Sequence, residues 1–326
     1  MKTPDFWYRP PGLAARLLTP AGRLYGLAGA LRRRFATPQR APVPVICIGN
    51  LVAGGAGKTP VALAVAEALG TKAVHFLTRG YGGREAGPIP VEPERHDAAT
   101  VGDEALLLAQ ARPTWVARDR VAGAMAAAEA GAKIIVMDDG FQNPHLDKTL
   151  SLLVVDGQSG FGNRHLVPAG PLREPVETGL SRADALVLIG EDRTHISDRY
   201  RTRLPILTGR LEPAAETADL KGRRVLAFAG IGRPAKFFAT CEDLGARLVE
   251  GVAFPDHHPY REDEIMTLVE RAAAADAIPV TTVKDYVRLP AEARAMVRTV
   301  PVAVTWNDPT ALTRLLAPIV NHHGNA

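Results

Sequence analysis

The sequence predicts an α/β fold, in which a parallel sheet with helices on both faces is followed by a second, smaller α/β domain. From residue 43 onward, short apolar segments alternate with helical segments, which is the pattern of buried parallel strands joined by crossover helices. A second series of the same kind begins near Lys221, after a stretch rich in proline and polar residues. A chain of 326 residues is long enough to bury two such cores.

The composition is that of a folded globular protein, with 46% hydrophobic and 23% charged residues. The net charge of +4 is too small to indicate nucleic acid binding by itself. Cys47 and Cys241 each lie in an apolar stretch, so we expect buried free thiols in a reducing compartment rather than a disulfide or a metal pair. The N-terminus lacks the pattern of a signal peptide, and no apolar run is long enough to span a membrane.

Residues 1–36 predict a basic amphipathic segment. Apolar side chains recur at helical spacing between Leu13 and Phe35, and arginines, including those at 32–34, lie among them. Such a helix suits the surface of an anionic membrane. It could instead pack on its own domain with its arginines in water. We expect the proline and glycines within it to interrupt a long regular helix. The sequence leaves both interpretations open.

We expect the first domain, the nucleotide-binding one, to span residues 37–203. Its first strand, 43–50, is rich in β-branched residues and ends near a glycine, and the segment 59–70 after it predicts a helix that closes on a glycine. The alanine-rich segment 120–132 predicts another covering helix. Near-continuous apolar runs predict further buried strands at 73–78, 133–138, 150–156 and 185–189.

The rest of the chain predicts a connector at 204–213, the second α/β domain at 214–300, and a returning strand and helix at 301–326. Within the second domain, apolar runs predict strands at 224–229 and 279–283. We expect the connector strand 206–211 to pair with the exit strand 300–306. The final helix, 309–320, would then return to the first domain.

A glycine-rich loop, "GNLVAGGAGKTP" at 49–60, lies between the first strand and its helix. Backbone N–H groups in such a loop can converge on a phosphate at the positive end of the helix. Lys58 would contact the terminal phosphates of the nucleotide, and the Thr59 hydroxyl would bind Mg²⁺. The strict spacing of this motif fails at Val52, but the adjacent glycines can supply the tight backbone. The sequence therefore predicts a P-loop NTPase-like domain whose nucleotide loop consists of Val52, Ala53, Gly54, Gly55, Ala56, Gly57, Lys58 and Thr59.

The segment "KIIVMDDG" predicts a strand that delivers Asp138 and Asp139 to the carboxyl edge of the sheet. A carboxylate at this position of a nucleotide-binding sheet normally holds Mg²⁺, directly or through water. Paired aspartates can also be turn residues at a strand end, an interpretation that the glycine loop weakens. The expected metal ligands are Thr59, Asp138 and Asp139, and the expected cofactors are ATP and Mg²⁺.

Four more stretches contain more polar and glycine residues than packing needs: "TRGYGG" at 78–83, "VGDEA" at 101–105, "FGNRHLVPAGPLREP" at 161–175 and "FPDHHPY" at 254–260. A kinase that acts on a sugar hydroxyl needs a base near the acceptor oxygen and positive groups around the transferred phosphoryl group. The candidate bases are Asp103, Asp139 and His257. The candidate positive groups are Arg79, Arg120 and Arg173. Asp103 also occupies a natural N-cap position before a helical segment, which is its structural alternative.

Together these motifs resemble the tetraacyldisaccharide 4'-kinase family, the lipid A 4'-kinases of Gram-negative bacteria. The resemblance covers nearly the whole chain, in the order "APVPVICIGNLVAGGAGKTP", "TRGYGG", "VGDEA", "MDDGFQN", "FGNRHLVPAGPLRE", "GIGRPAKFF", "FPDHH" and "TTVKD". It makes Val52 normal for the loop. It implies transfer of the ATP γ-phosphate to the 4'-hydroxyl of a tetraacylated glucosamine disaccharide 1-phosphate, which gives lipid IVA at the cytoplasmic face of the inner membrane.

The resemblance also implies roles for individual residues. Asp103 of "GDE" would be the base and His257 of "DH" its partner, acting as a unit. Lys58 and Asp139 complete the implied catalytic set, with Asp139 supporting the metal and the acceptor. Four residues in family motifs would neutralise phosphate charge: Arg79, Arg120, Gln142 and Arg173. The chain departs from the common family pattern at Thr78, Asn143 and Val283, none of them in the implied catalytic set.

Two other classes of function stay open at this point. One is a membrane-associated P-loop switch ATPase without lipid kinase activity. Such proteins usually carry a second lysine before the glycine pair, where this chain has Ala53. The other is a non-catalytic lipid or scaffold protein, which the intact lysine and aspartates disfavour. For the kinase we expect a peripheral or monotopic protein that contacts a lipid-linked disaccharide and an anionic membrane surface, with no nucleic acid or protein partner implied.

Overall fold

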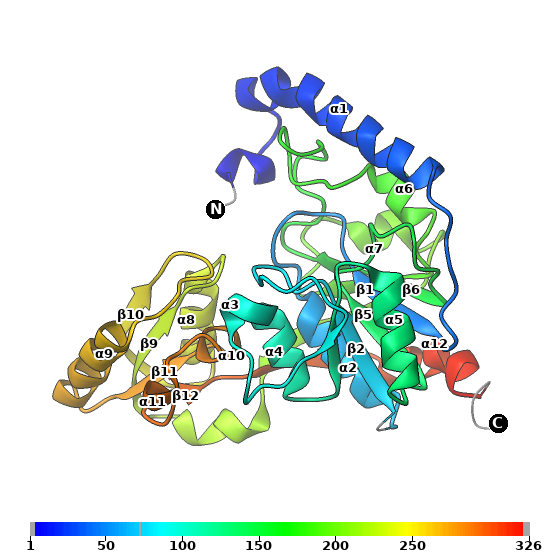
Figure 1. Ribbon diagram of the computed structural model, residues 1–326. Coiled ribbons are helices and arrows are strands. Elements are labelled where there is room, and N and C mark those ends of the chain that lie inside the picture. The colour runs from blue at the N-terminus through cyan, green and yellow to red at the C-terminus, as the bar shows by residue number, and fades with distance from the viewer. Residues whose placement is uncertain (1–3, 72, 322–326) are drawn as a thin grey trace.

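The computed structural model describes residues 4–71 and 73–321. It contains a sheet of nine strands and a sheet of four strands, each packed against helices (Figure 1). The large sheet has the order β13-β8-β7-β6-β1-β5-β2-β4-β3, and the small sheet has the order β10-β9-β11-β12. The strand pairs of both sheets are parallel, with two exceptions. At the two edges of the large sheet, β8 pairs with β13 and β3 pairs with β4 in antiparallel orientation. The predicted α/β class is confirmed.

The centre of the large sheet is apolar because its parallel strands are covered on both faces. Every residue of β1, β2, β5, β6 and β7 is buried. The strands of this sheet are β1 (Val45–Gly49), β2 (Val74–Thr78), β3 (Ile89–Pro90), β4 (Thr114–Val116), β5 (Ile134–Asp138), β6 (Leu150–Asp156), β7 (Ala185–Ile189), β8 (Ile206–Pro213) and β13 (Val302–Trp306).

Helices cover the large sheet on opposite faces. Helix α2 contacts α4 and α12, which places these three on one face. The connection from β4 to β5 through α5 runs across the sheet in the opposite direction to the connection from β1 to β2 through α2. Because both crossovers are right-handed, α5 lies on the opposite face from α2. The helices of this part are η1 (Asp5–Tyr8), α1 (Leu13–Arg34), α2 (Lys58–Ala68), α3 (Ala98–Val101), α4 (Asp103–Ala109), α5 (Arg120–Glu129), α6 (Val176–Leu180), α7 (Ile196–Tyr200) and α12 (Pro309–Asn321).

The small sheet forms the second lobe, with an apolar core on each face. Helix α8 packs over one core and helix α9 over the other. Its strands are β9 (Arg224–Ala229), β10 (Arg247–Ala253), β11 (Ile278–Thr281) and β12 (Arg298–Thr299). Its helices are η2 (Ala215–Leu220), α8 (Pro234–Asp243), α9 (Glu262–Ala274), α10 (Val283–Tyr286) and α11 (Ala291–Arg294).

The two lobes are joined by a pair of antiparallel strands. The chain leaves the large sheet through β8 and returns through β13, with Val304 opposite Leu211 in the register. Helix α12 then packs against α2 of the first lobe. The expected pairing of the connector with the exit strand, and the return of the last helix, are therefore present.

Helix α1 corrects an expectation. Pro20 and three glycines were expected to interrupt it, yet it is continuous from Leu13 to Arg34. The glycines serve packing instead: an added Cβ would lie 2.9 Å from the Leu166 carbonyl oxygen at Gly22, and 2.5 Å from a Leu166 methyl at Gly26. No helix in residues 4–71 and 73–321 has the length and apolar character needed to cross a membrane.

Local differences from the expected elements have simple causes. Strands β4 and β10 were not predicted, since β4 has three residues and β10 has no fully buried position. The strand expected at 279–283 ends at Thr281, because Thr282 caps α10 by accepting a hydrogen bond from the Asp285 N–H. Cys47 and Cys241 are free and buried, as expected.

Candidate active site

The nucleotide loop connects buried β1 to α2, whose first residue is Lys58. Gly57 adopts φ +84 and Gly54 φ +129, conformations that glycine reaches without strain. Gly49 is required for a different reason, because an added Cβ would lie 2.3 Å from the Cβ of Phe141. Gly57 offers no side chain to cap α2, so the first N–H groups of the helix can face an anion.

Two cations converge on Asp139, at the turn after β5. The Arg173 guanidinium donates to its Oδ1 over 2.8 Å, and the Lys58 Nζ lies 3.7 Å from the same oxygen. Burial alone would raise the pKa of Asp139, but Lys58 and Arg173 outweigh burial and lower it. The side-chain oxygen of Gln142 accepts from Arg173 over 3.4 Å. The structure therefore brings together four of the predicted site residues.

Asp138 has a different environment from its neighbour. The Thr59 hydroxyl donates to its Oδ2 over 2.9 Å, while its Oδ1 is buried with no hydrogen-bond partner among the residues described. Burial, followed by the charge of Glu104, raises the pKa of Asp138 to about 7. A buried carboxylate with no ion-pair partner among the described residues, next to a threonine hydroxyl at a helix start, fits Mg²⁺, which prefers oxygen ligands.

The arrangement favours Asp138 over Asp139 as a metal ligand, since Asp139 already contacts two cations. Within the described part of the chain, no group of three or more His, Cys, Asp or Glu side chains could hold a metal. A site built from Thr59 and Asp138 is typical of Mg²⁺ bound largely through nucleotide phosphates and water.

Arg79 and Arg120 form a second basic group. Arg120, the first residue of α5, is 4% exposed, and its Nη1 donates to the Ala117 carbonyl. Its Nε has no hydrogen-bond partner among the described residues. Burial, and then the nearby charge of Arg79, lowers the pKa of Arg120 to about 10. Two guanidinium groups so close to each other favour an anion between them.

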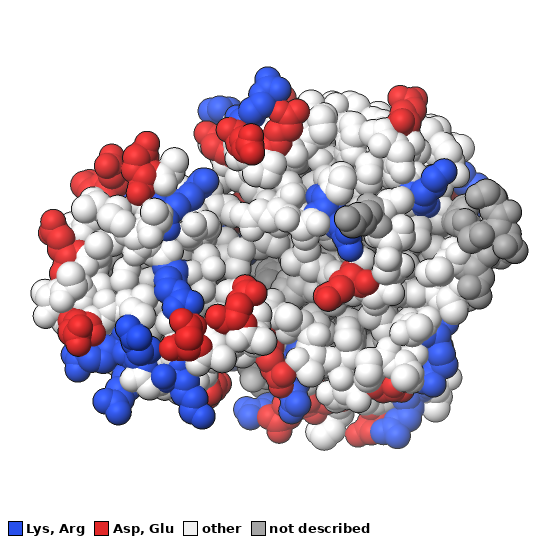
Figure 2. Space-filling model, turned by 90° about the horizontal axis from the view of Figure 1, so that it is seen from below, with Lys and Arg blue, Asp and Glu red and all other residues white. Residues whose placement is uncertain are grey.

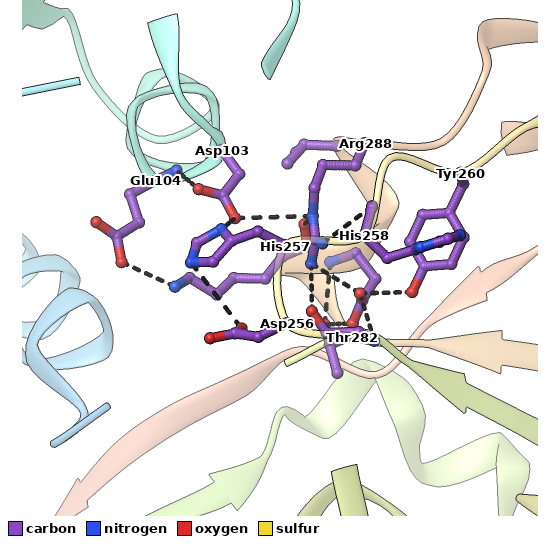
Figure 3. Close-up of polar contacts among 12 residues, drawn as sticks. Asp103, Glu104, Asp256, His257, His258, Tyr260, Thr282 and Arg288 are labelled. Carbon is purple, nitrogen blue, oxygen red and sulfur yellow. Dashed lines mark hydrogen bonds and ion pairs between the residues drawn. The ribbon is translucent and has the colours of Figure 1, made fainter. Parts of the chain in front are cut away.

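Asp103 and His257 meet although they come from different lobes. The Nδ1 of His257, in the loop after β10, lies 3.0 Å from Oδ2 of Asp103, which is 3% exposed (Figure 3). Burial would raise the pKa of Asp103, but His257, Lys284 and Arg288 lower it. In return, contact with Asp103 raises the pKa of His257 against the effect of burial.

The alternative role of Asp103 as an N-cap does not match its position. Asp103 is the first residue of α4, and the cap residue is Gly102. Its Oδ1 accepts only from the adjacent Glu104 N–H, over 3.0 Å, whereas an N-cap side chain bonds an amide two or three residues on. The neighbouring His258 contacts Glu264 over 3.0 Å and so turns away from Asp103.

Two acidic residues that we did not select also belong to this region. Glu104 accepts from Lys284 of the second lobe over 2.8 Å, beside the Asp103 contact. Glu174, 1% exposed, accepts from Gln142 over 3.1 Å and also from Arg182. Both lie within the "VGDEA" and "PLREP" stretches, which were selected as motifs. No local spacing, however, indicates which cations they contact.

Three comparisons identify relatives of this chain. Residues 14–321 match the family model described as tetraacyldisaccharide-1-P 4'-kinase. The tetraacyldisaccharide 4'-kinase of Rhodospirillum centenum is 58% identical and covers 100% of both chains, and that of Paramagnetospirillum magneticum is 54% identical and covers 97% of this chain and 98% of its own. The crystal structure of "apo" form LpxK from Aquifex aeolicus in complex with ATP has a TM-score of 0.77 and 28% identity, and covers 94% of this chain and 100% of that one. The chain therefore belongs to the tetraacyldisaccharide-1-P 4'-kinase family.

Proposed function

We propose that this protein transfers the γ-phosphoryl group of ATP to the 4'-hydroxyl of a tetraacylated glucosamine disaccharide 1-phosphate, which forms lipid IVA in lipid A biosynthesis. The observation that carries the proposal is the kinase-family match over residues 14–321 in a chain with an intact nucleotide loop. The related Aquifex aeolicus protein was crystallised with ATP, which supports ATP as the donor. Nothing in the structure favours the alternative of a switch ATPase.

The nucleotide loop binds the triphosphate in this proposal. Loop N–H groups and Lys58 contact the phosphates, and Thr59 and Asp138 would hold Mg²⁺. When bound, the ion neutralises charge on the phosphate oxygens. Asp139 holds Lys58 and Arg173 in place before the nucleotide arrives, so these charges need no rearrangement during the transfer.

The acid–base step falls to Asp103 and His257. As the 4'-oxygen bonds to the γ-phosphorus, the bond from phosphorus to the bridging oxygen breaks, ADP leaves, and the hydroxyl proton passes to Asp103. The low pKa of Asp103 makes it a weak base, which a loose phosphoryl transition state tolerates because little charge develops on the attacking oxygen. His257 lies 3.0 Å away and shares the proton, so the two titrate as a unit.

The remaining cations surround the transferred group. Arg79 and Arg120 hold two positive charges near Asp138 and Asp139, whose charges in turn raise the pKa of Arg120 against burial. Such a pre-arranged positive site stabilises charge that spreads over the equatorial phosphoryl oxygens. Gln142 orients Arg173 by accepting a hydrogen bond from its guanidinium.

We place the protein peripherally on an anionic membrane, at the cytoplasmic face of the Gram-negative inner membrane, and helix α1 supports the membrane contact in this proposal. Six large apolar side chains of α1 and its C-cap residue are 45–78% exposed: Leu13, Leu17, Leu24, Leu27, Leu31 and Phe35. Figure 1 shows α1 along the upper edge of the molecule. Figure 2 views the opposite side, where acidic and basic side chains are interspersed. An exposed apolar stripe on a helix that also carries arginines favours a lipid surface over packing on the protein.

The activity is tested by incubation with γ-labelled ATP, Mg²⁺ and detergent-dispersed disaccharide lipid, followed by chromatography of the lipid. We expect a labelled lipid, and a Lys58→Ala variant that folds but loses most of the transfer. Release of labelled phosphate without a labelled lipid would support the switch ATPase instead.

The membrane position is tested by sedimentation with anionic liposomes. The full chain should sediment with vesicles rich in phosphatidylglycerol, and a double variant, Leu24→Gln with Leu27→Gln, should sediment less. Equal sedimentation of both proteins would exclude α1 as the membrane contact.

We also propose that residues 37–203 form the nucleotide-binding domain and residues 214–300 the second domain, with a connector at 204–213 and a connector strand and C-terminal helix at 301–326, of which 322–326 lie outside the described residues. The two separate sheets and their separate cores support this division. Limited proteolysis that releases a stable fragment near 214–300 would test it. Cleavage that destroys both halves together would contradict it.

A further inference from the structure

Arg288, just after α10 in the second lobe, has five polar contacts although its side chain is 6% exposed. Its Nη2 donates to Asp285 Oδ1 over 2.7 Å and to the Gly230 carbonyl over 3.0 Å. Its Nη1 donates to the His258 carbonyl over 3.2 Å, and its Nε to the Lys284 carbonyl over 3.1 Å. The same Nε lies 3.7 Å from Oδ2 of Asp103, across the junction between the lobes (Figure 3).

Two of these contacts hold the loop that carries His257. Arg288 binds the carbonyl of His258, the next residue, and the carbonyl of Gly230. The His257 N–H itself donates to the Gly230 carbonyl over 3.0 Å. His257 has φ +58, a left-handed conformation that is uncommon for a residue with a side chain and needs support from its surroundings. Arg288 supplies that support on both sides of the residue.

Arg288 is itself fixed by Asp285, whose side chain is completely buried. The Oδ1 of Asp285 accepts from Tyr260 over 2.7 Å and from the Gly230 N–H over 2.8 Å, in addition to Arg288. Its Oδ2 accepts from the Thr282 hydroxyl over 2.5 Å. A buried carboxylate with this many donors has one favourable orientation, so it directs the guanidinium toward the lobe junction.

We propose that Arg288 is a positioning residue for phosphoryl transfer, which fixes the His257 loop and the Asp103 carboxylate at their contact distance while Asp285 orients the guanidinium. The inference rests on the proposed function, because it takes Asp103 and His257 as the acid–base pair. The planar fork of the guanidinium reaches three carbonyls, the Asp285 carboxylate and the Asp103 side chain at once, so lysine is an incomplete substitute. Arg288 is not expected to touch the sugar or ATP.

The kinetic test compares Arg288→Gln, Arg288→Lys and a control, Arg294→Gln. Arg294 lies in the same segment and donates to the carbonyls of Leu289 and Val287. We expect Arg288→Gln to lower kcat roughly 10- to 100-fold with little change in the KM for ATP, since displacement of an acid–base group by about 1 Å has a cost of this size. Arg288→Lys should recover part of the loss, and Arg294→Gln should keep the wild-type kcat.

A cycle with His257→Gln separates positioning from general destabilisation. If Arg288 acts through the pair, Arg288→Gln should lower kcat by a clearly smaller factor once His257 is absent, and the remaining loss reports its contact with Asp103. An equal fold loss in both backgrounds would overturn the proposal, as would a wild-type kcat in Arg288→Gln. If Arg288→Gln does not fold, Arg288→Lys in the same two backgrounds gives the same decision.

A readout without substrate distinguishes failure of this inference from failure of the proposed function. The imidazole resonances of His257, assigned with the His257→Gln variant, report its pKa in the free protein. Asp103, Asp256, Lys284 and the ring of Tyr81 face this imidazole. Arg288→Lys keeps the charge but loses the fork, so the His257 pKa should fall toward about 6.5 as contact with Asp103 is lost. An unchanged pKa would overturn the positioning role, whereas a wild type that labels no lipid would overturn only the proposed function.

Discussion

At the scale of single residues, adjacent carboxylates differ because their neighbours differ. Asp138 is buried and Asp139 is half-buried at the end of β5, yet the pKa of Asp138 is raised and that of Asp139 is lowered. Asp138 has a neutral hydroxyl within hydrogen-bond distance, whereas Asp139 has Lys58 and Arg173. Asp138 is therefore the carboxylate to which an added cation contributes most stability.

Asp103→Asn is the sharpest test at this scale. We expect kcat to fall roughly 100- to 10,000-fold, the usual contribution of a general base, with ATP affinity nearly unchanged. The matched control is Asp97→Asn, because Asp97 is a true N-cap whose side chain accepts from the Thr100 N–H over 2.8 Å. That variant should lose stability at most and keep kcat. If Asp103→Asn only lowers stability, as a lost cap would, Asp103 is not the base.

The Asp103–His257 pair also predicts a pH-dependent stability. The pKa of folded His257 is raised, so its contribution is full below its unfolded pKa of about 6.5 and is lost as pH rises through the folded value. The pKa of folded Asp103 is lowered, so its contribution is present above an unfolded pKa of about 3.9 and is lost as pH falls through the folded value.

Denaturant unfolding at a series of pH values checks this prediction. The wild type should exceed His257→Gln in free energy of unfolding most between about pH 4 and 6.5, and less at higher pH. In an Asp103→Asn background the pH dependence of the difference should shrink. A difference that grows above pH 7 would contradict the ion pair.

At the scale of elements, the glycines of α1 allow close packing of the helix against a neighbouring loop, although glycine lowers the intrinsic stability of a helix. Each glycine costs a free helix about 1 kcal/mol, and Pro20 removes one N–H donor. Gly22 and Gly26 nevertheless lie directly against Leu166, and Trp7 donates to the Pro168 carbonyl over 3.0 Å. The loop after β6 thus holds α1 by close backbone contact and leaves its leucines free.

Gly22→Val should detach α1 from this loop, because a Cβ there lies 2.9 Å from a backbone oxygen. We expect a loss of about 1–3 kcal/mol in the docking of α1, seen as faster tryptic cleavage at its arginines. Gly29→Ala is the control, since its Cβ would be 3.6 Å from its nearest neighbour, the guanidinium of Arg33, which is an ordinary van der Waals distance. Equal cleavage of both variants would contradict the packing role of Gly22.

At the scale of the whole molecule, described residues of the second lobe contact the first lobe through strands, an ion pair and a pair of helices. The strands β8 and β13 join the lobes covalently, Arg233 binds Asp156 over 2.8 Å beside the nucleotide loop, and α10 faces α4. The last junction contains the Asp103 and Glu104 contacts. The contact between Asp103 and His257 therefore exists only while the lobes are docked, which would couple the position of the lobes to the proposed acid–base step.

A double-mutant cycle on Glu104 and Lys284 measures this docking. Their side chains are 23% and 32% exposed, so Glu104→Gln and Lys284→Gln should couple by about 0.5–3 kcal/mol in unfolding free energy. The exposed pair of Arg298 and Asp219, within the second lobe, is the control and should couple by about 0.2–1 kcal/mol. If the coupling energy of Glu104 with Lys284 is smaller than that of the control pair, this ion pair does not stabilise the docking of the two lobes.

The sequence by itself determined the features that depend on neighbouring residues. Continuous apolar runs predicted β1, β5, β6 and β7, because a strand covered on both faces needs no polar positions. The glycine loop and the paired aspartates were recognisable because strand, loop and helix follow one another directly. The burial of both cysteines and the pairing of the returning strand with the connector could also be predicted from the sequence.

The tertiary structure decided everything that depends on which distant segments meet. It brought His257 to Asp103, Lys284 to Glu104, and Arg288 to both the loop and the carboxylate. Tertiary packing also accounts for the continuous helix α1, because Gly22 and Gly26 lie against Leu166 of a distant loop. The physical reason is that the distance between two side chains on different lobes is set by how their sheets and helices pack, and no local spacing along the chain records that packing.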